Sequence, residues 1–402
     1  MRLKTVRSIR SLKGKRALVR VDFNVPIGAD GSVDAEGDER IRRALPTIDY
    51  LRQRGSIVVL AAHLGRPDGK VVEAYRMKPV STYLERLMNV SVRQLDAVVG
   101  PNVTAAISNA KPGDVLMLEN LRFDPREEKN QDDFSRALAE LADYYVDDAF
   151  GNAHREHSSM VGITKYGKSY AGLLLAEEVR QLSALIARPK RPFTAIIGGV
   201  KLSTKLAVIK TFVKIADHVL LGGNLANTVL KASGVAVGRS PVEERLLPAL
   251  RSLQFTNTKL HVPVDVVTAP SPEAVGQVAT KAVANVAPDE YILDIGPDTL
   301  QLFDTVIRDA ATIVWNGPMG KFELTPFAAG TLGIVHAIAH TKAKVVVGGG
   351  ETVEALRQYL PKPVSEYPNL YLSTGGGAML QFLEHGTLPA LEPLRQASRF
   401  AN

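Results

Sequence analysis

Short apolar runs rich in β-branched residues alternate with longer amphipathic segments along almost the whole chain. The strand candidates are residues 16–23, 56–62, 114–120, 143–150, 193–199, 218–223, 291–296, 312–317, 344–350 and 370–374. The intervening segments, such as 40–55 and 202–216, carry apolar residues at helical spacing. Because parallel strands need long crossovers, this alternation predicts an α/β fold with parallel sheets covered by helices on both faces.

The number of strand candidates indicates more than one domain. Ten strands are many for one doubly wound sheet, and 402 residues are long for one domain. Residues 165–190 contain a loop, a long helical segment and a proline-flanked link. We therefore predict two α/β domains with their boundary in this region.

Composition excludes several classes of function. The chain has no cysteine, which excludes disulfides, thiol catalysis and thiolate metal sites. We expect no transmembrane helix, because the apolar runs are short, and no secretory signal, because the basic N-terminus lacks an apolar core. The net charge of +7 admits nucleic-acid binding, but the basic residues are dispersed, aromatic residues make up 6%, and no nucleic-acid motif stands out. We expect a small anionic substrate rather than nucleic acid.

The stretch AAHLGRPDGK, residues 61–70, places an imidazole and a guanidinium directly after an apolar strand. Glycine and proline suffice for a turn, so His63 and Arg66 indicate a site for an anion. Other strand ends in the first half carry similar groups, and ligands of open α/β sheets bind at these ends. These polar residues are Asp22, Asn24, Arg40, Asn120, Arg122, His154 and Arg155. They suit a small phosphate ester, and the alternative is a set of surface arginines paired with carboxylates.

The second half carries glycine runs at 198–199, 222–223, 348–350 and 375–377. Glycines that precede helices let backbone N–H groups approach phosphate, and two of these runs begin predicted helices. On a helix, Lys201 and Lys205 would share one face, which indicates either a phosphate contact or a solvated surface. The chain lacks the P-loop motif and a GxGxxG motif in its first βα unit. An anion-binding half and a nucleotide-phosphate half together favour phosphoryl transfer.

Eight segments then resemble the phosphoglycerate kinase family, in the family's order and over nearly the full chain. They are RVDFNVP (20–26), HLGRP (63–67), LENLRF (118–123), DDAFGNAHREHSS (147–159), GGVKLSTK (198–205), WNGPMGKFE (315–323), GGGET (348–352) and STGGGA (373–378). The resemblance implies two Rossmann-like three-layer (αβα) domains, joined by a hinge helix. It places the N-terminal phosphoglycerate-binding domain at 1–170 plus about 387–402, with the C-terminal tail returning to it. It places the nucleotide-binding domain at 171–386.

The resemblance also implies an activity and its site residues. The activity is reversible phosphoryl transfer from 1,3-bisphosphoglycerate to ADP, giving ATP and 3-phosphoglycerate, directly and in line after hinge closure. The phosphoglycerate would be held by Asp22, Phe23, Asn24, Arg40, His63, Leu64, Gly65, Arg66, Arg122 and Arg155. The nucleotide would be held by Lys205, Asn316, Glu323, Gly349, Gly350, Glu351 and Thr352, with Glu323 at the ribose. Arg40, Lys201 and Lys205 would be catalytic. The resemblance further implies Mg²⁺ bound with the nucleotide, a monomer, a cytoplasmic location and no membrane partner.

The chain departs from the family pattern at three places. Glu351 stands where the family usually has the aspartate associated with Mg²⁺, so the metal geometry is open. Asn224 stands where a third glycine is common, near the expected adenine site, and could change base preference. The loop at 27–40 is longer than usual and is expected at the surface. Two rival functions are a non-catalytic nucleotide-binding or scaffold protein and a kinase for a different acid.

Overall fold

The computed structural model describes residues 1–251 and 258–395, which form two compact units. Unit 1 contains residues 1–181 and the described part of 387–402, and unit 2 contains residues 182–386. The division falls inside helix α6 (Leu173–Ala187). The first turn of α6 belongs to unit 1 because its amides are bound there: Leu173 N donates to Thr47 Oγ1 (2.9 Å), and Leu175 N donates to Asp148 Oδ1 (3.1 Å).

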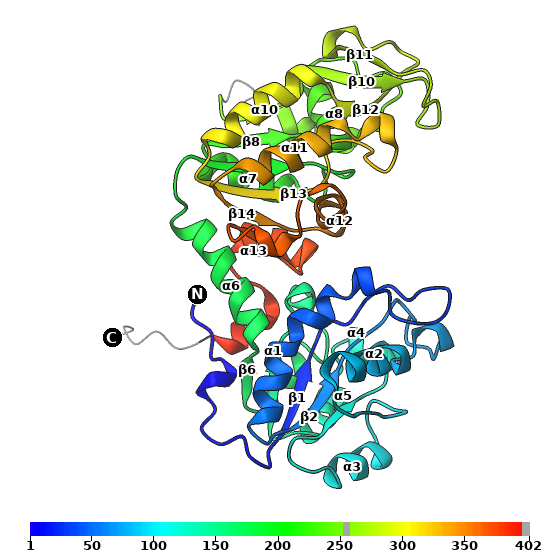
Figure 1. The fold of residues 1–402 in the computed structure, drawn as a ribbon, viewed down its shortest axis with the longest axis vertical. Coiled ribbons are helices and arrows are strands. Elements are labelled where there is room, and N and C mark those ends of the chain that lie inside the picture. Colours follow the sequence, from blue (N-terminus) through cyan, green and yellow to red (C-terminus); the bar gives the residue numbers. More distant parts are fainter. Residues whose placement is uncertain (252–257, 396–402) are drawn as a thin grey trace. The chain divides into compact units, whose positions relative to one another are not determined.

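Unit 1 contains a six-stranded parallel sheet, drawn in the lower part of Figure 1. In spatial order its strands are β3 (Val92–Gln94), β4 (Val115–Met117), β2 (Ile57–Ala61), β1 (Arg16–Arg20), β5 (Tyr144–Asp147) and β6 (Ser169–Ala171). The carboxyl ends of β4, β2, β1 and β5 are therefore adjacent along one edge, which is where the sequence places its arginines and histidines.

Helices cover both faces of this sheet. The α-helices of unit 1 before α6 are α1 (Glu39–Gln53), α2 (Lys78–Met88), α3 (Pro101–Ser108), α4 (Pro125–Glu128) and α5 (Asp132–Glu140). The 3₁₀ helices are η1 (Val6–Ser8), η2 (Ala35–Gly37), η3 (Glu73–Tyr75), η4 (Leu121–Phe123), η5 (Phe150–Asn152), η6 (Gly162–Lys165) and η11 (Pro389–Leu394). Side chains alternate along β1: Val19 packs in a core with Ile48 of α1, whereas Leu18 packs in a second core with Phe134 of α5.

Unit 2 repeats this architecture and adds a small antiparallel sheet. Its parallel sheet runs in the order β15 (Leu370–Leu372), β14 (Lys344–Val347), β13 (Thr312–Asn316), β7 (Phe193–Ile197), β8 (His218–Leu221) and β9 (Leu260–His261). The antiparallel sheet has the order β11 (Ala279–Ala282), β10 (Asp265–Ala269) and β12 (Tyr291–Ile295).

The helices of unit 2 follow its strands along the chain (Figure 1). They are α7 (Leu206–Ile215), α8 (Gly223–Ala232), α9 (Leu247–Arg251), α10 (Pro297–Asp309), α11 (Ala329–His340), α12 (Gly350–Tyr359) and α13 (Gly376–His385). The 3₁₀ helices are η7 (Glu244–Leu246), η8 (Val283–Asn285), η9 (Thr325–Phe327) and η10 (Val364–Glu366). As predicted, α12 and α13 both begin within glycine runs, so each presents free backbone N–H groups at a strand exit.

The predicted strands differ from the observed ones in extent and number. Every predicted strand is present but shorter, because the residues at its carboxyl end leave the ladder and form loops. The sequence did not predict β3, β6, β9, β10 or β11, and β6 lies in a segment that was expected to be a loop. Four of these strands have two to four residues, too few for a periodic signal. The expectation for 291–296 was wrong in one respect, because β12 pairs antiparallel with β10.

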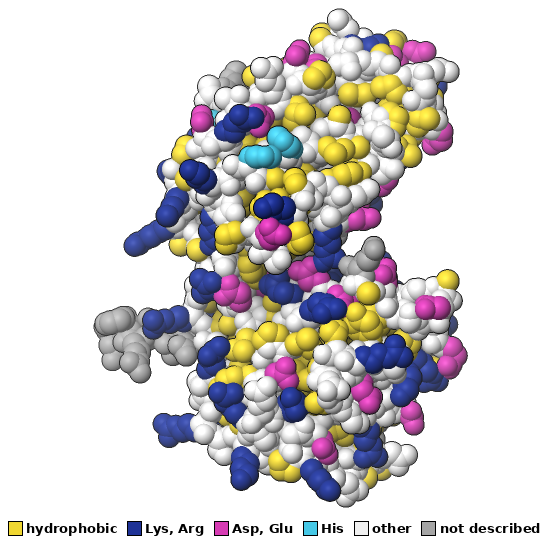
Figure 2. Space-filling model, viewed as in Figure 1, with side chains coloured by type: hydrophobic (Ala, Val, Ile, Leu, Met, Phe, Trp, Pro, Cys, Tyr) yellow, Lys and Arg dark blue, Asp and Glu magenta, His cyan; other side chains and the backbone are white. Residues whose placement is uncertain are grey.

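On the face drawn in Figure 2, Lys and Arg side chains are interleaved with Asp and Glu over both units. This distribution agrees with the dispersed basic residues of the sequence. Among the described residues, no helix is long and apolar enough to cross a membrane.

Candidate active site

The carboxyl-end edge of the unit 1 sheet collects most of the predicted acid-binding residues. Residues 22–24 follow β1, 63–66 follow β2, Arg122 lies in η4 after β4, and Arg155 follows η5 after β5. Since these four strands are neighbours, the loops that leave them lie side by side. The predicted convergence of cationic groups at one sheet edge is therefore present in the fold.

Arg40, in the first turn of α1, is anchored to the loop after β1. Its Nη1 donates to Asn24 O (3.1 Å) and lies 3.2 Å from Asp22 Oδ2 as an ion pair. Asp22 is buried, while the Arg40 side chain is 37% exposed. The guanidinium is thus held at its base by a carboxylate and still presents part of its surface to solvent.

The loop after β2 depends on Gly65. Its φ is +65°, and a Cβ at this position would lie 2.5 Å from the ring of Tyr75. Gly65 N donates to Asn24 Oδ1 (2.9 Å), and Gly65 O accepts from Arg122 Nη1 (3.0 Å). One glycine therefore ties together the loops that follow β1, β2 and β4.

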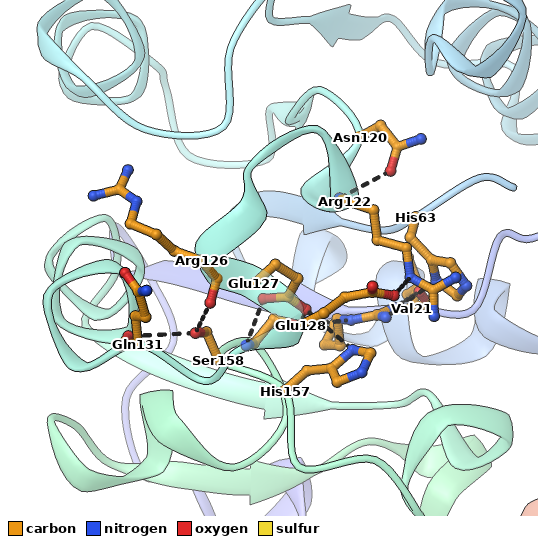
Figure 3. Close-up of polar contacts among 12 residues, drawn as sticks. Val21, His63, Asn120, Arg122, Arg126, Glu127, Glu128, Gln131, His157 and Ser158 are labelled. Carbon is orange, nitrogen blue, oxygen red and sulfur yellow. Dashed lines mark hydrogen bonds and ion pairs between the residues drawn. The ribbon is translucent and has the colours of Figure 1, made fainter. Parts of the chain in front are cut away.

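Arg122 and its neighbours carry unpaired hydrogen-bonding groups. Arg122 is 4% exposed and forms an ion pair with Glu128, and both residues are drawn in Figure 3. Its Nε lies 3.0 Å from Glu128 Oε1. Burial lowers the pKa of Arg122 below its ordinary value, more than Glu128 raises it. Among the described residues, its Nη2 has no hydrogen-bond partner, and neither have Arg155 Nε and His154 Nδ1. Buried polar atoms are almost always paired, so these atoms are available to a ligand.

His63 lies beside Arg122 in Figure 3 and is 3% exposed. Its pKa is well below 6.5, first because of burial and then because of Arg20, Arg122, Arg155 and Arg40. The imidazole is therefore neutral at physiological pH. It acts as a hydrogen-bonding group rather than as the cation that its place among arginines suggests.

Three further predicted residues of unit 1 differ in their exposure. Phe23 and Leu64 have buried side chains that pack in the core, so only their backbones are available to a ligand. Arg66 is exposed at the loop surface.

In unit 2, Lys205 is the N-cap residue of α7. Its Nζ donates to Gly198 O (2.6 Å) and more weakly to Asn316 O (3.4 Å). Burial lowers the pKa of Lys205 to about 8, and Glu351 opposes this shift. A Cβ at Gly317, whose φ is +94°, would lie 2.5 Å from Nζ, so only glycine leaves room for the ammonium.

The expectation that Lys201 and Lys205 share a helix face is wrong. Helix α7 begins at Leu206, after both lysines, and Lys201 lies in the preceding loop. Lys201 is exposed, whereas Lys205 is half-buried. The turn at Leu202–Lys205 separates them, because Lys205 N donates to Leu202 O (2.8 Å).

Asn316 and Thr352 connect β13 to the start of α12. Asn316 Nδ2 donates to Gly348 O (2.6 Å), and Thr352 Oγ1 accepts from Gly317 N (2.7 Å). Both side chains are buried. They hold the 348–350 glycine loop at the strand end, where the N–H groups of α12 begin.

A cavity of about 340 Å³ opens in unit 2 between α8, β12 and the loop after β13. Pro241, Ile292 and Met319 supply apolar lining. The predicted residues Asn224, Glu323 and Glu351 also line the cavity. An apolar chamber with carboxylates and glycine backbone on its wall suits a nucleotide.

The donor set does not make a dedicated metal site. Among the described residues, no group of three or more His, Cys, Asp or Glu side chains is placed to hold a metal ion. Glu351, exposed in the first turn of α12, is a single carboxylate beside the cavity. One carboxylate fits Mg²⁺ that keeps water and phosphate oxygens as its other ligands.

Sequence reasoning missed the polar groups beneath the unit 1 site. Arg20, Glu127 and Ser159 are buried and bonded to one another or to His63. The available signal was an arginine at the end of an otherwise apolar buried strand, RALVR. Its side-chain partners lie 43 and 139 residues away in sequence, so no local pattern identifies them.

Comparisons with known proteins agree with this geometry. The profile of the family described as "Phosphoglycerate kinase" matches residues 6–386. Phosphoglycerate kinases of Pelotomaculum thermopropionicum and Moorella thermoacetica are 44% and 45% identical over 398 and 391 residues, covering 98% and 96% of this chain and 99% and 97% of theirs. The solved structure of phosphoglycerate kinase from Coxiella burnetii matches with a TM-score of 0.84 and 35% identity, covering 98% of this chain and 99% of that one. The chain therefore belongs to the phosphoglycerate kinase family.

Proposed function

We propose that this chain catalyses the reversible transfer of the acyl phosphate of 1,3-bisphosphoglycerate to ADP, which gives ATP and 3-phosphoglycerate. Family membership supports the reaction. The observation that carries the site assignment is a set of buried nitrogens in unit 1, on Arg122, Arg155 and His154, that have no hydrogen-bond partner in the described part of the chain. A phosphate ester that also carries a carboxyl group supplies the acceptors that these nitrogens lack.

In this proposal, unit 1 binds the acid substrate. Buried Arg122 and His63 and half-buried Arg155 surround it, and Arg66 approaches from the exposed loop. Arg40 reaches it from α1. The remaining predicted residues position these groups: Asp22, Asn24 and Gly65 through the bonds described above, and Phe23 and Leu64 through the backbone.

Unit 2 binds the nucleotide. The apolar cavity takes the base, and Glu323 at its wall takes the ribose. The phosphates extend toward Lys205 and the N-terminus of α12, where Gly349, Gly350 and Thr352 present backbone N–H groups. Asn316 fixes this loop from behind.

The chemistry requires little covalent assistance from the protein. The attacking or leaving group is a carboxylate, so neither a strong base nor a covalent intermediate is needed. Charge spreads over the oxygens of the transferred phosphoryl group in a loose transition state, and cations in fixed positions stabilise that charge. Arg40 of unit 1 and Lys205 of unit 2, with Lys201, fill this role. Because the reactants are assigned to different units, hinge closure precedes the in-line transfer and excludes water.

Mg²⁺ accompanies the nucleotide, and when bound it neutralises phosphate charge. Glu351 is the protein carboxylate that contributes to holding it. We further propose a cytoplasmic monomer with small-molecule substrates and without nucleic-acid or membrane partners.

The first test is the reverse reaction with ATP and 3-phosphoglycerate, coupled to NADH oxidation through glyceraldehyde-3-phosphate dehydrogenase. We expect turnover that depends on Mg²⁺ and on both substrates. Replacing 3-phosphoglycerate with acetate or another simple carboxylic acid should abolish turnover, since no phosphate ester then reaches the arginines. A folded protein without turnover under these conditions would exclude the proposed reaction and leave the two rival functions, a non-catalytic protein or a kinase for a different acid.

A further inference from the structure

A buried arginine lies beneath the acid site and has no role in the mechanism above. Arg20 ends β1, one of the two central strands of the unit 1 sheet, and is 1% exposed. It shares the sheet face of Leu18, which is the face covered by α5. Burying a guanidinium costs free energy unless its donors are paired. The hydrogen-bond partners of Arg20 therefore indicate why an arginine occupies this position.

Each nitrogen of the Arg20 guanidinium has a partner. Nε donates to Ser159 Oγ (3.0 Å), Nη1 donates to Val21 O, and Nη2 lies 3.2 Å from His63 Nδ1. Ser159 in turn donates through its hydroxyl and its backbone N (2.9 Å) to the two carboxylate oxygens of Glu127. A continuous chain of hydrogen bonds therefore runs from buried Glu127 to the ring of His63.

The chemistry of arginine decides where the proton of His63 lies. A guanidinium has only donors and stays protonated in proteins. Nδ1 of His63 must therefore be the acceptor of the bond from Arg20. In a neutral imidazole, one nitrogen accepts and the other carries the proton, so the proton lies on Nε2.

We propose that Arg20 is a positioning residue, whose bond to Nδ1 holds His63 as the neutral Nε2–H tautomer that donates to an oxygen of the acid substrate. This inference rests on the proposed function, because it assigns the acceptor to that substrate. Ser159 and Glu127 hold the guanidinium in place through their hydrogen bonds. Burial raises the pKa of the Glu127 carboxyl, and the charge of Arg20 opposes that shift.

The surrounding charges support the same state of His63. Burial and the cations Arg20, Arg122, Arg155 and Arg40 all lower its pKa. The carboxylates on the other side, Glu127 and Glu128, are engaged by Ser159 and Arg122 rather than by His63. Protonating Nδ1 would also bring two donors face to face. His63 therefore stays neutral. It contributes a directed hydrogen bond to a site whose positive charge already comes from arginine.

The tautomer can be measured directly, without substrate or activity. In long-range ¹H–¹⁵N spectra of histidine-labelled protein, the two ring nitrogens of each tautomer give distinct signals. The chain has eight histidines, so His63→Gln identifies the His63 signals by their loss. We expect a protonated Nε2 and an unprotonated Nδ1 that do not change between pH 5 and 8. An Nδ1–H tautomer, or titration near the ordinary pKa of 6.5, would overturn the inference.

The role of Arg20 is tested by Arg20→Met, with Arg16→Met as a matched control. Arg16 begins the same strand but pairs with Asp143 at the surface. Arg20→Met should release the tautomer, so that signals of the Nδ1–H form appear beside those of the Nε2–H form, while burial and the remaining arginines keep the ring neutral. It should also raise KM for 3-phosphoglycerate about tenfold, because the Nδ1–H tautomer has no donor at Nε2. Arg16→Met should change neither the signals nor this KM.

The outcomes separate this inference from the proposed function. Unchanged His63 signals in a folded Arg20→Met protein would exclude the positioning role. If Arg20→Met does not fold, Ser159→Ala keeps the guanidinium but removes its Nε partner, and the same change in signals is expected at smaller amplitude. If the natural chain has the expected tautomer but no turnover, the proposed function fails while the assignment of the proton stands. Addition of 3-phosphoglycerate should then leave the Nε2 signal unchanged. That result would exclude a hydrogen bond from Nε2 to this substrate.

Discussion

At the scale of single residues, Arg40 offers the sharpest test of catalysis. Within the described residues, Arg40 bonds to Asp22 and Asn24 through Nη1, which leaves Nε and Nη2 to meet the transferred phosphoryl group. We expect Arg40→Ala to lower kcat by roughly 10³-fold, as the loss of an arginine finger does, with little change in nucleotide affinity. Steady-state kinetics and nucleotide titration measure both quantities.

The matched control for Arg40 is Arg42→Ala. Arg42 lies on the same helix, is 57% exposed and pairs with Asp38 at 2.6 Å. It should retain nearly full activity. A near-normal kcat for Arg40→Ala would exclude Arg40 from the transition state.

The lowered pKa of Lys205 predicts how activity depends on pH. Its pKa is lowered to about 8 by burial, and only the charged form attracts phosphate. The proton is therefore present below pH 8 and is lost as pH rises through that value. We expect kcat/KM for MgADP to be level below pH 8 and to fall above it, because this quantity reports the free enzyme.

Lys201→Met is the control for this profile. Lys201 is exposed, so its replacement should leave the fall at the same pH, whereas Lys205→Met should remove the fall together with most of the activity. A natural enzyme whose kcat/KM stays level to pH 9.5 would contradict the assignment of this proton to Lys205.

At the scale of elements, the loop after β2 depends on the backbone freedom of Gly65. Gly65→Ala must adopt a φ of +65° and meets the ring of Tyr75. We expect the free energy of unfolding to fall by about 1–3 kcal/mol, measured in urea. KM for 3-phosphoglycerate should rise as well, because Gly65 anchors Arg122 and Asn24.

Gly167→Ala is the control for Gly65. No heavy atom of the described residues lies within 4 Å of its added Cβ, and its φ is not in the left-handed region. Its free energy of unfolding should stay within about 0.5 kcal/mol of the natural value. An equal loss of unfolding free energy in the two variants would mean that the φ of Gly65 and its contact with Tyr75 do not disfavour a larger residue.

Because of Glu351, at the N-terminus of α12, we expect Mg²⁺ binding and the pKa of Lys205 to depend on the same residue. Glu351 raises the pKa of Lys205 against the effect of burial, and it is the proposed carboxylate for Mg²⁺. Glu351→Gln should therefore raise the Mg²⁺ concentration for half-maximal activity and should also shift the fall in kcat/KM below pH 8. Glu351→Asp keeps the charge and should preserve both. A changed Mg²⁺ requirement with an unchanged pH profile would separate the two roles.

At the scale of the whole molecule, the assignment of one reactant to each unit predicts when the shape changes. 3-Phosphoglycerate and MgADP can bind together without reacting, since neither carries the transferable phosphoryl group. We expect the radius of gyration from X-ray scattering to fall with both ligands and much less with either alone. Light scattering should give the mass of one chain, 43.5 kDa. A fall of the same size with one ligand would mean that closure does not require both.

Much of this architecture follows from local sequence patterns. Alternating β-branched and amphipathic segments predicted the parallel sheets, because strand and helix periods are properties of neighbouring residues. The arginines and histidines at strand ends predicted an anion site, since parallel strands deliver their carboxyl ends to one edge. Short strands such as β6 and the antiparallel pairing of β12 were missed, because pairing partners rather than local pattern define them.

By itself, the sequence determined the fold class, the family motifs and the groups at the edge of each sheet. Only the tertiary structure decided that Lys205 is half-buried while Lys201 is exposed, and that His63 is neutral. It also joined Arg20 to Ser159 across 139 residues. The physical reason is the same in each case. Burial and hydrogen-bond partners arise from packing between segments that are distant in sequence. Burial and partners then set the protonation state and the orientation of each side chain, which the sequence does not show.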